Sequence, residues 1–254
     1  MRKIATLLLL AAMTACGGGG GESSSNACGD LNVKVFGGDQ CNFSRSPVVA
    51  IVGFSESGAP ISVCSATMVT TNDALTAAHC AQVVASPGGA GLFADGQFFR
   101  IVAGRNHPRY NGAVASPYDV AMITIDGVLD IGPVPLLLSD PIAAGERITI
   151  FGYGKNEDHT GVPQASDFRA GYMELSLVDP FQFAAFFDTT GSSICQGDSG
   201  GPATQTADGV TAIVGVTSFT VRGCQDGSAS GFVNVQNPEI FNFIRAYAPD
   251  VAIR

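Results

Sequence analysis

Short apolar runs, separated by residues that favour turns, make up most of the chain from Val48 onward. Stretches such as Ser-Pro-Gly-Gly, Asn-Gly and Asp-Gly divide these runs. Many short strands with such turn signals indicate an all-β barrel or sandwich. The 32 glycines and 13 prolines agree with this, because turn residues are rarer in helix bundles. We expect strands within residues 48–54, 66–70, 120–125, 147–151, 172–178, 211–219 and 231–235.

One segment near the end of the chain follows a helical pattern instead. Asn237 is a suitable N-cap and Pro238 a suitable first helical residue. The apolar residues that follow recur at helical spacing: Ile240, Phe243, Ile244 and Tyr247. A closing amphipathic helix over about 238–247, docked on a barrel, fits this pattern.

Length and charge narrow the class of protein. A chain of 254 residues can form one large domain or two small barrels that share a core. The formal net charge is −9 and no Lys/Arg-rich run is present, which argues against nucleic acid as a partner.

The N-terminus has the pattern of an export signal. Arg2 and Lys3 precede an apolar run over residues 4–13 that is too short to span a bilayer. Residues 13–16, Met-Thr-Ala-Cys, resemble the lipobox of bacterial lipoproteins, in which the Cys carries a lipid. We therefore expect a signal peptide over 1–15, a lipid on Cys16 as the only membrane contact, and a flexible linker and propeptide over 16–34. The Gly after Cys16 favours, by resemblance, an outer-membrane lipoprotein of a Gram-negative bacterium. Ordinary cleavage, giving a freely secreted protein, is the alternative.

The cysteine count agrees with export. The chain has seven Cys, and a lipid on Cys16 leaves six for disulfides, which exported proteins can keep. Spacing alone leaves all 15 pairings open. No pair of cysteines has zinc-ligand spacing and the chain has three histidines, so we expect no metal site. The six are Cys28, Cys41, Cys64, Cys80, Cys195 and Cys224.

Three residues have the chemistry that peptide hydrolysis by serine requires: a hydroxyl, an imidazole base and a carboxylate that fixes the imidazole. Ser199 lies in Gly-Asp-Ser-Gly-Gly-Pro, residues 197–202. His79 lies in Thr-Ala-Ala-His-Cys, and Asp119 precedes a strongly apolar run.

These motifs, in the order His, Asp, Ser, resemble those of the chymotrypsin/trypsin family from about Val35 to the C-terminus. The resemblance implies two six-stranded antiparallel β-barrels with a C-terminal helix: an N-terminal barrel over about 35–135 and a C-terminal barrel over about 145–236. It implies Ser199 as nucleophile, His79 as general base and Asp119 as its orienting partner. The amides of Gly197 and Ser199 would form the oxyanion hole.

The resemblance also resolves the disulfides. Cys64 would pair with Cys80, next to the base, and Cys195 with Cys224, between the serine loop and the wall of the specificity pocket. Cys28 and Cys41 remain for each other.

It further predicts a zymogen. Lys34 precedes Val-Phe-Gly-Gly, so we expect another protease to cut after Lys34. The new amino group of Val35 would then pair with Asp198.

The specificity pocket is predicted by alignment to the same motifs. Ser193 would form its base, where no charge awaits Lys or Arg, with the bulky Ile194 beside it. Ser218, Phe219 and Thr220 would form the strand that pairs with substrate, Thr220 narrowing the entrance. Gln196 would lie beside the oxyanion hole and Ser230 on the far wall. Small to medium aliphatic P1 side chains are therefore expected.

Two other classes of function fit the sequence less well. A protease-like binding module would usually lack a catalytic residue, and here His79, Asp119 and Ser199 are all present. An α/β-hydrolase esterase needs the order Ser, Asp, His, which the chain does not have. His107 is expected to be structural and His159 exposed. We expect a monomeric endopeptidase without metal or organic cofactor, acting on proteins or peptides.

Overall fold

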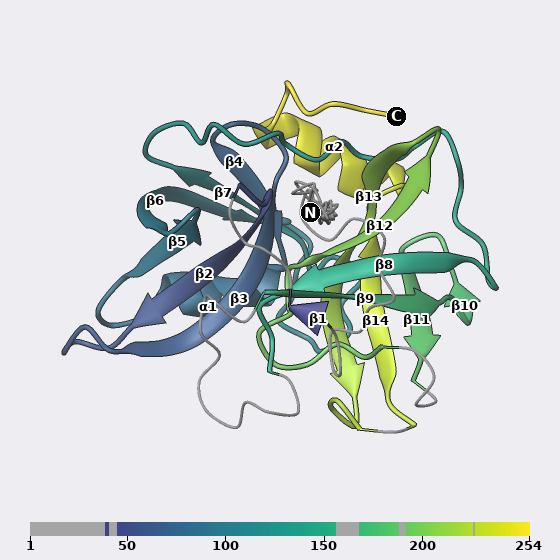
Figure 1. The fold of residues 1–254 in the computed structure, drawn as a ribbon, viewed down its shortest axis with the longest axis horizontal. Coiled ribbons are helices and arrows are strands. Elements are labelled where there is room, and N and C mark those ends of the chain that lie inside the picture. Colours follow the sequence, from purple (N-terminus) through teal and green to yellow (C-terminus); the bar gives the residue numbers. More distant parts are fainter. Residues whose placement is uncertain (1–38, 41–44, 156–167, 188–191, 226) are drawn as a thin grey trace, which may run out of the picture.

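The computed structural model describes residues 39–40, 45–155, 168–187, 192–225 and 227–254. In this part of the chain two antiparallel sheets lie side by side, with the helix α2 (Pro238–Tyr247) across one end (Figure 1). Six residues with predicted roles lie outside the described residues: Cys16, Cys28, Lys34, Val35, Cys41 and His159.

The first sheet is a closed barrel in the order β2-β3-β4-β7-β6-β5. A short helical segment, η1 (Ala78–Cys80) and α1 (Ala81–Val84), joins β4 to β5. The strands are β2 (Val48–Phe54), β3 (Pro60–Met68), β4 (Asp73–Thr76), β5 (Ala90–Ala94), β6 (Gln97–Asn106) and β7 (Ala121–Ile125).

The second sheet has eight strands within the described residues and forms a half-barrel in the order β1-β9-β8-β12-β13-β14-β11-β10. Two-residue strands form both of its edges. The strands are β1 (Asp39–Gln40), β8 (Arg147–Gly152), β9 (Arg169–Glu174), β10 (Leu177–Val178), β11 (Gln182–Phe186), β12 (Pro202–Ala207), β13 (Val210–Val221) and β14 (Ala229–Asn234).

Strand β2 explains how the two sheets hold together. Its apolar run is unbroken because both of its faces are buried, as side chains alternate between the two sides of a strand. Val49 and Ile51 belong to the core of the barrel. The alternate residues of β2 pack with Tyr153 and Phe168, which lie directly after β8 and directly before β9 of the second sheet.

The C-terminal helix begins where the sequence predicts. The Asn237 side chain accepts hydrogen bonds from the backbone N–H groups of Glu239 and Ile240, the role of an N-cap. Ile240, Phe243 and Ile244 are buried. Within the described residues, no helix is long and apolar enough to cross a membrane.

The expected fold class, two antiparallel β-barrels with a C-terminal helix, is confirmed. The first barrel has the six strands expected, whereas the second sheet has eight within the described residues because two-residue strands extend both of its edges. Individual strands differ from expectation at their ends. The run over 66–70 is the end of β3, which begins at Pro60, and the run over 172–178 is divided between β9 and β10. Such differences are expected, because exposed strand ends have no apolar pattern.

Candidate active site

The first sheet brings His79 and Asp119 together, although the two are 40 residues apart. His79 lies in η1, directly after β4, and Asp119 lies just before β7, the strand that pairs with β4. The backbone N–H of His79 donates to Asp119 Oδ1 at 2.9 Å, and His79 Nδ1 lies 2.8 Å from Asp119 Oδ2. A carboxylate only accepts hydrogen bonds, so this contact places the ring proton on Nδ1 and leaves Nε2 as a proton acceptor.

A third donor to Asp119 comes from the second sheet. Ser218 Oγ donates to Asp119 Oδ2 at 2.6 Å, and both residues are buried. The sequence predicts Ser218 as part of the strand that pairs with substrate, but it does not predict the hydrogen bond of the Ser218 side chain to Asp119. The bond joins residues of the two sheets that are 99 positions apart in the chain, and sequence spacing does not reveal such a contact.

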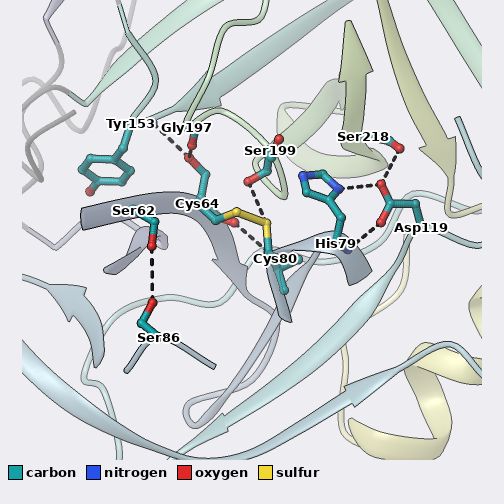
Figure 2. The surroundings of a disulfide bond; sticks show 12 residues. Ser62, Cys64, His79, Cys80, Ser86, Asp119, Tyr153, Gly197, Ser199 and Ser218 are labelled. Atoms are coloured by element: carbon teal, nitrogen blue, oxygen red, sulfur yellow. Dashed lines mark hydrogen bonds and ion pairs between the residues drawn. A yellow bond between two sulfur atoms is a disulfide. The ribbon is translucent and has the colours of Figure 1, made fainter. Parts of the chain in front are cut away.

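Ser199 lies in a tight turn between Gly197 and Pro202, where β12 begins. In the view of Figure 2 the His79 ring lies between Ser199 and Asp119. Cys80 Sγ lies 3.6 Å from the Ser199 carbonyl oxygen; this is a contact rather than a hydrogen bond, because a disulfide sulfur carries no proton. No hydrogen bond joins Ser199 Oγ to His79 within the described residues, and such bonds often form only when substrate binds.

The turn is anchored to β13 by its backbone. Gly200 N–H donates to the Thr217 carbonyl at 2.8 Å, and Thr217 N–H donates to the Gly201 carbonyl at 2.9 Å. Gly197 has φ +101°, a conformation that glycine adopts readily. The conformation at the start of the turn therefore favours glycine at residue 197, and hydrogen bonds to Thr217 of β13 fix the end of the turn.

Asp198 is a buried carboxyl held by backbone amides. Cys195 N–H donates to its Oδ2 and Gly154 N–H to its Oδ1, both at 2.8 Å. Burial raises the pKa of Asp198 to about 7, against the opposing effect of these two hydrogen bonds. Gly152 and Gly154 face the carboxylate so closely that a Cβ at either position would overlap it.

The residues predicted for the specificity pocket form a buried group of hydroxyls. Ser193 is fully buried, and its Oγ lies 3.0 Å from Ser228 Oγ. Ile194, also buried, donates its backbone N–H to Ser230 Oγ at 3.3 Å. These side chains are uncharged, so none of them can form an ion pair with a basic substrate side chain.

Three other residues predicted for the pocket are less buried. Thr220 Oγ1 donates to the Gly223 carbonyl at 2.8 Å, and Gln196 is exposed. Phe219 is half-buried, and its ring packs against Gly231, where a Cβ would overlap the ring.

Two of the expected disulfides are present. Cys64 is bonded to Cys80, and Cys195 to Cys224. The sulfurs of Cys64 and Cys80 lie close to a His79 ring nitrogen, but as a disulfide they offer no thiolate to a metal ion. His107 is buried between the rings of Tyr118 and Phe243, which is a packing role.

Comparison with known proteins agrees with this geometry. Chymotrypsin-like elastase family member 1 of Homo sapiens is 24% identical, over 86% of this chain and 91% of the relative. A chymotrypsin-like serine proteinase of Haliotis rufescens is 25% identical, over 87% of this chain and 94% of the relative. Granzyme M of Homo sapiens is 30% identical, over 65% of this chain and 71% of the relative. The profile of the family Trypsin matches residues 35–243. The chain therefore belongs to the trypsin family of serine proteases and is a hydrolase.

Proposed function

We propose that the chain is a serine endopeptidase in which Ser199 is the nucleophile, His79 the general base and Asp119 its orienting partner. The observation that carries the proposal is the chain of hydrogen bonds from Ser218 through Asp119 to His79. It fixes the ring so that Nε2 is the proton acceptor, which is the state a general base requires.

Catalysis then proceeds through an acyl-enzyme. Ser199 Oγ attacks the carbonyl carbon of the scissile bond as its proton passes to His79 Nε2. The amides of Gly197 and Ser199 bind the oxyanion, and His79 returns the proton to the leaving amine. Water then attacks the acyl ester by the same route and regenerates Ser199.

We infer a preference for small or medium aliphatic P1 side chains. The predicted base of the pocket is the buried Ser193, with the buried Ser230 on the predicted far wall, and neither carries a charge that would form an ion pair with Lys or Arg. The similarity to a chymotrypsin-like elastase supports this preference.

Zymogen control is part of the proposal. Asp198 is a fully buried carboxyl with no cationic partner among the described residues. An α-amino group on Val35, freed by cleavage after Lys34, would supply the missing charge. The family profile begins at residue 35, which supports a protease domain over 35–254 with barrels over about 35–135 and 145–236 and a helix over about 238–247.

Export as a lipoprotein also remains a proposal from the sequence. The signal over 1–15 would direct export, and the lipid on Cys16 and the linker over 16–34 would hold a monomeric enzyme at the outer membrane. An activating protease and protein or peptide substrates would be its partners.

Labelling with a fluorophosphonate tests the proposal. The full chain is treated before and after cleavage at Lys34 by trypsin, with Ser199→Ala treated in the same way as background. We expect the parent to be labelled only after cleavage and to hydrolyse peptides with Ala or Val at P1. Labelling before cleavage would overturn zymogen control alone. Absence of labelling in both forms would overturn the assignment of Ser199.

A further inference from the structure

Ser65 is a buried residue that contacts the serine loop from the opposite sheet. It lies in β3, directly after Cys64, and is fully buried. No motif that identifies the catalytic residues includes it. Its polar atoms nevertheless bond to both residues whose amides are assigned to the oxyanion hole.

The backbone and the hydroxyl of Ser65 both take part. Its N–H donates to the Ser199 carbonyl at 2.8 Å. Its Oγ donates to the Gly197 carbonyl at 2.8 Å and accepts the N–H of Tyr153 at 2.9 Å. One hydroxyl therefore satisfies two buried backbone groups, the first in the serine loop and the second just after β8. Figure 2 shows Tyr153, Gly197 and Ser199 gathered around this part of β3, beside Cys64.

The Gly197 carbonyl needs such a partner. Gly197 has φ +101°, and glycine can exchange this conformation for others at little steric cost. A rotation of the residue would turn its N–H away from the oxyanion. A hydrogen bond to the carbonyl holds the peptide plane that follows Gly197 and so restricts the rotations that would redirect this N–H. The direction of the N–H matters because an oxyanion donor acts only when it points at the oxyanion.

The same residue is joined to the strand that leads to His79. Thr76 Oγ1 donates to the Ser65 carbonyl at 2.8 Å, and Thr76 ends β4, three residues before His79. Gly200 packs so closely on this pair that a Cβ there would overlap both Thr76 Oγ1 and the Ser65 carbonyl oxygen. The loop of the nucleophile is therefore seated on the strands that carry the base.

We propose that Ser65 is a positioning residue for the oxyanion hole. By donating a hydrogen bond to the Gly197 carbonyl, its hydroxyl keeps the Gly197 amide pointed at the developing oxyanion. The inference rests on the proposed function and names a residue that neither the motifs nor the triad geometry include. Its effect must appear in the transition state, because the oxyanion does not exist in bound substrate.

Ser65→Ala in the full chain, cleaved after Lys34, is the direct test, because it removes one oxygen and leaves the strand backbone intact. We expect kcat to fall by about 10- to 100-fold, less than for loss of an oxyanion donor itself, with KM changed less than about twofold. Rates are expressed per active site, counted by fluorophosphonate titration, so that a partly folded sample does not distort them.

A peptide aldehyde provides the readout that a merely structural role would not change. Its carbonyl carbon bonds to Ser199 Oγ while the serine proton passes through His79 to the aldehyde oxygen, which then occupies the oxyanion hole. We expect its Ki to rise by the same factor as kcat/KM falls. Thr67→Val is the matched control: Thr67 is buried two residues along the same strand, and its Oγ1 has no hydrogen-bond partner among the described residues. Its kcat and Ki should stay within about twofold of the parent.

Ser65→Cys serves where Ser65→Ala does not fold, since a thiol fits a similar space but donates and accepts hydrogen bonds weakly. We expect an intermediate loss of kcat in this variant. Unchanged kcat and Ki in Ser65→Ala, or in Ser65→Cys if only that variant folds, would overturn the proposal. A rise in KM alone would also overturn it, because that would place the effect in substrate binding. A parent enzyme that is not labelled and does not hydrolyse peptides would refute the proposed function itself, a result separate from any difference between the variants.

Discussion

Ser218 Oγ donates a 2.6 Å hydrogen bond to Asp119 Oδ2, the same oxygen that lies 2.8 Å from His79 Nδ1. Asp119 is buried, and its two oxygens together receive three contacts: Ser218 Oγ, the His79 backbone N–H and the His79 ring. A buried carboxylate depends on such donors, because water cannot replace them. The position of the base is therefore set jointly by the two sheets.

Removing that donor should weaken catalysis without abolishing it. Among the described residues, Ser218→Ala leaves His79 as the hydrogen-bond partner of Asp119. We expect kcat/KM to fall by about 5- to 50-fold, a loss of roughly 1–2 kcal/mol. Steady-state kinetics on titrated enzyme measure this. Thr211→Ala, which removes an exposed hydroxyl from the same strand, should change nothing. Equal kinetics for the two variants would show that the Ser218 bond is dispensable.

The glycines that face Asp198 should tolerate no side chain. A Cβ at residue 154 would overlap the Asp198 carboxylate, so Gly154→Ala must displace the serine loop or the segment after β8. We expect kcat/KM to fall by more than about tenfold and stability by roughly 1–3 kcal/mol, as for other overpacked sites. Gly132→Ala is the control, because no atom lies within 4 Å of a Cβ built there. Full activity and stability in Gly154→Ala would contradict this packing.

The two disulfides should differ in what they support. Cys64–Cys80 closes a loop of 16 residues and Cys195–Cys224 one of 29, so each should contribute about 3–4 kcal/mol to the free energy of unfolding. Paired Cys→Ala variants, compared by urea denaturation, measure this. Loss of the first should lower kcat, because Cys80 adjoins His79, whereas loss of the second should mainly raise KM, because Cys195 adjoins the pocket residues. If loss of Cys64–Cys80 mainly raised KM and loss of Cys195–Cys224 mainly lowered kcat, these separate roles of the two disulfides would be refuted.

Stability of the uncleaved chain should depend on pH through Asp198. Its folded pKa of about 7 lies above the ordinary value of 3.8, so the folded state binds the proton more tightly than the unfolded state. This contribution is fully present below pH 3.8 and is lost as pH rises to about 7. Urea unfolding at several pH values should show this fall, of the order of a few kcal/mol, and Asp198→Asn should remove it. Cleavage after Lys34 should remove it too, since a paired amino group lowers the pKa of the carboxyl.

The sequence was sufficient for the parts of the site that lie in local motifs. Local motifs predict Ser199, His79 and Asp119 as the catalytic residues, and the structure brings His79 and Asp119 into contact. The buried strand β2 is predicted with its observed ends because apolar residues fill it from Val48 to Phe54. The helix α2 was predicted from its cap and its spacing, both of which are local.

What could not be predicted depends on contacts between segments distant in sequence. The bond of Ser218 to Asp119 spans 99 residues and that of Ser65 to Gly197 spans 132, so no local motif predicts either of them. Strand β6 was also missed: its residues are mostly exposed or half-buried, so it lacks the apolar pattern that reveals a buried strand.

Because the site is divided between two sheets, catalysis depends on the position of one sheet relative to the other. The proposed base, His79, comes from the first sheet and the proposed nucleophile, Ser199, from the loop that precedes β12 in the second. Ser65 and Ser218 each form a hydrogen bond to the other half. Neither half alone holds a complete set of reacting groups. A slight separation of the sheets would therefore abolish activity before either sheet unfolds. Activity should accordingly be lost at a lower temperature or denaturant concentration than secondary structure.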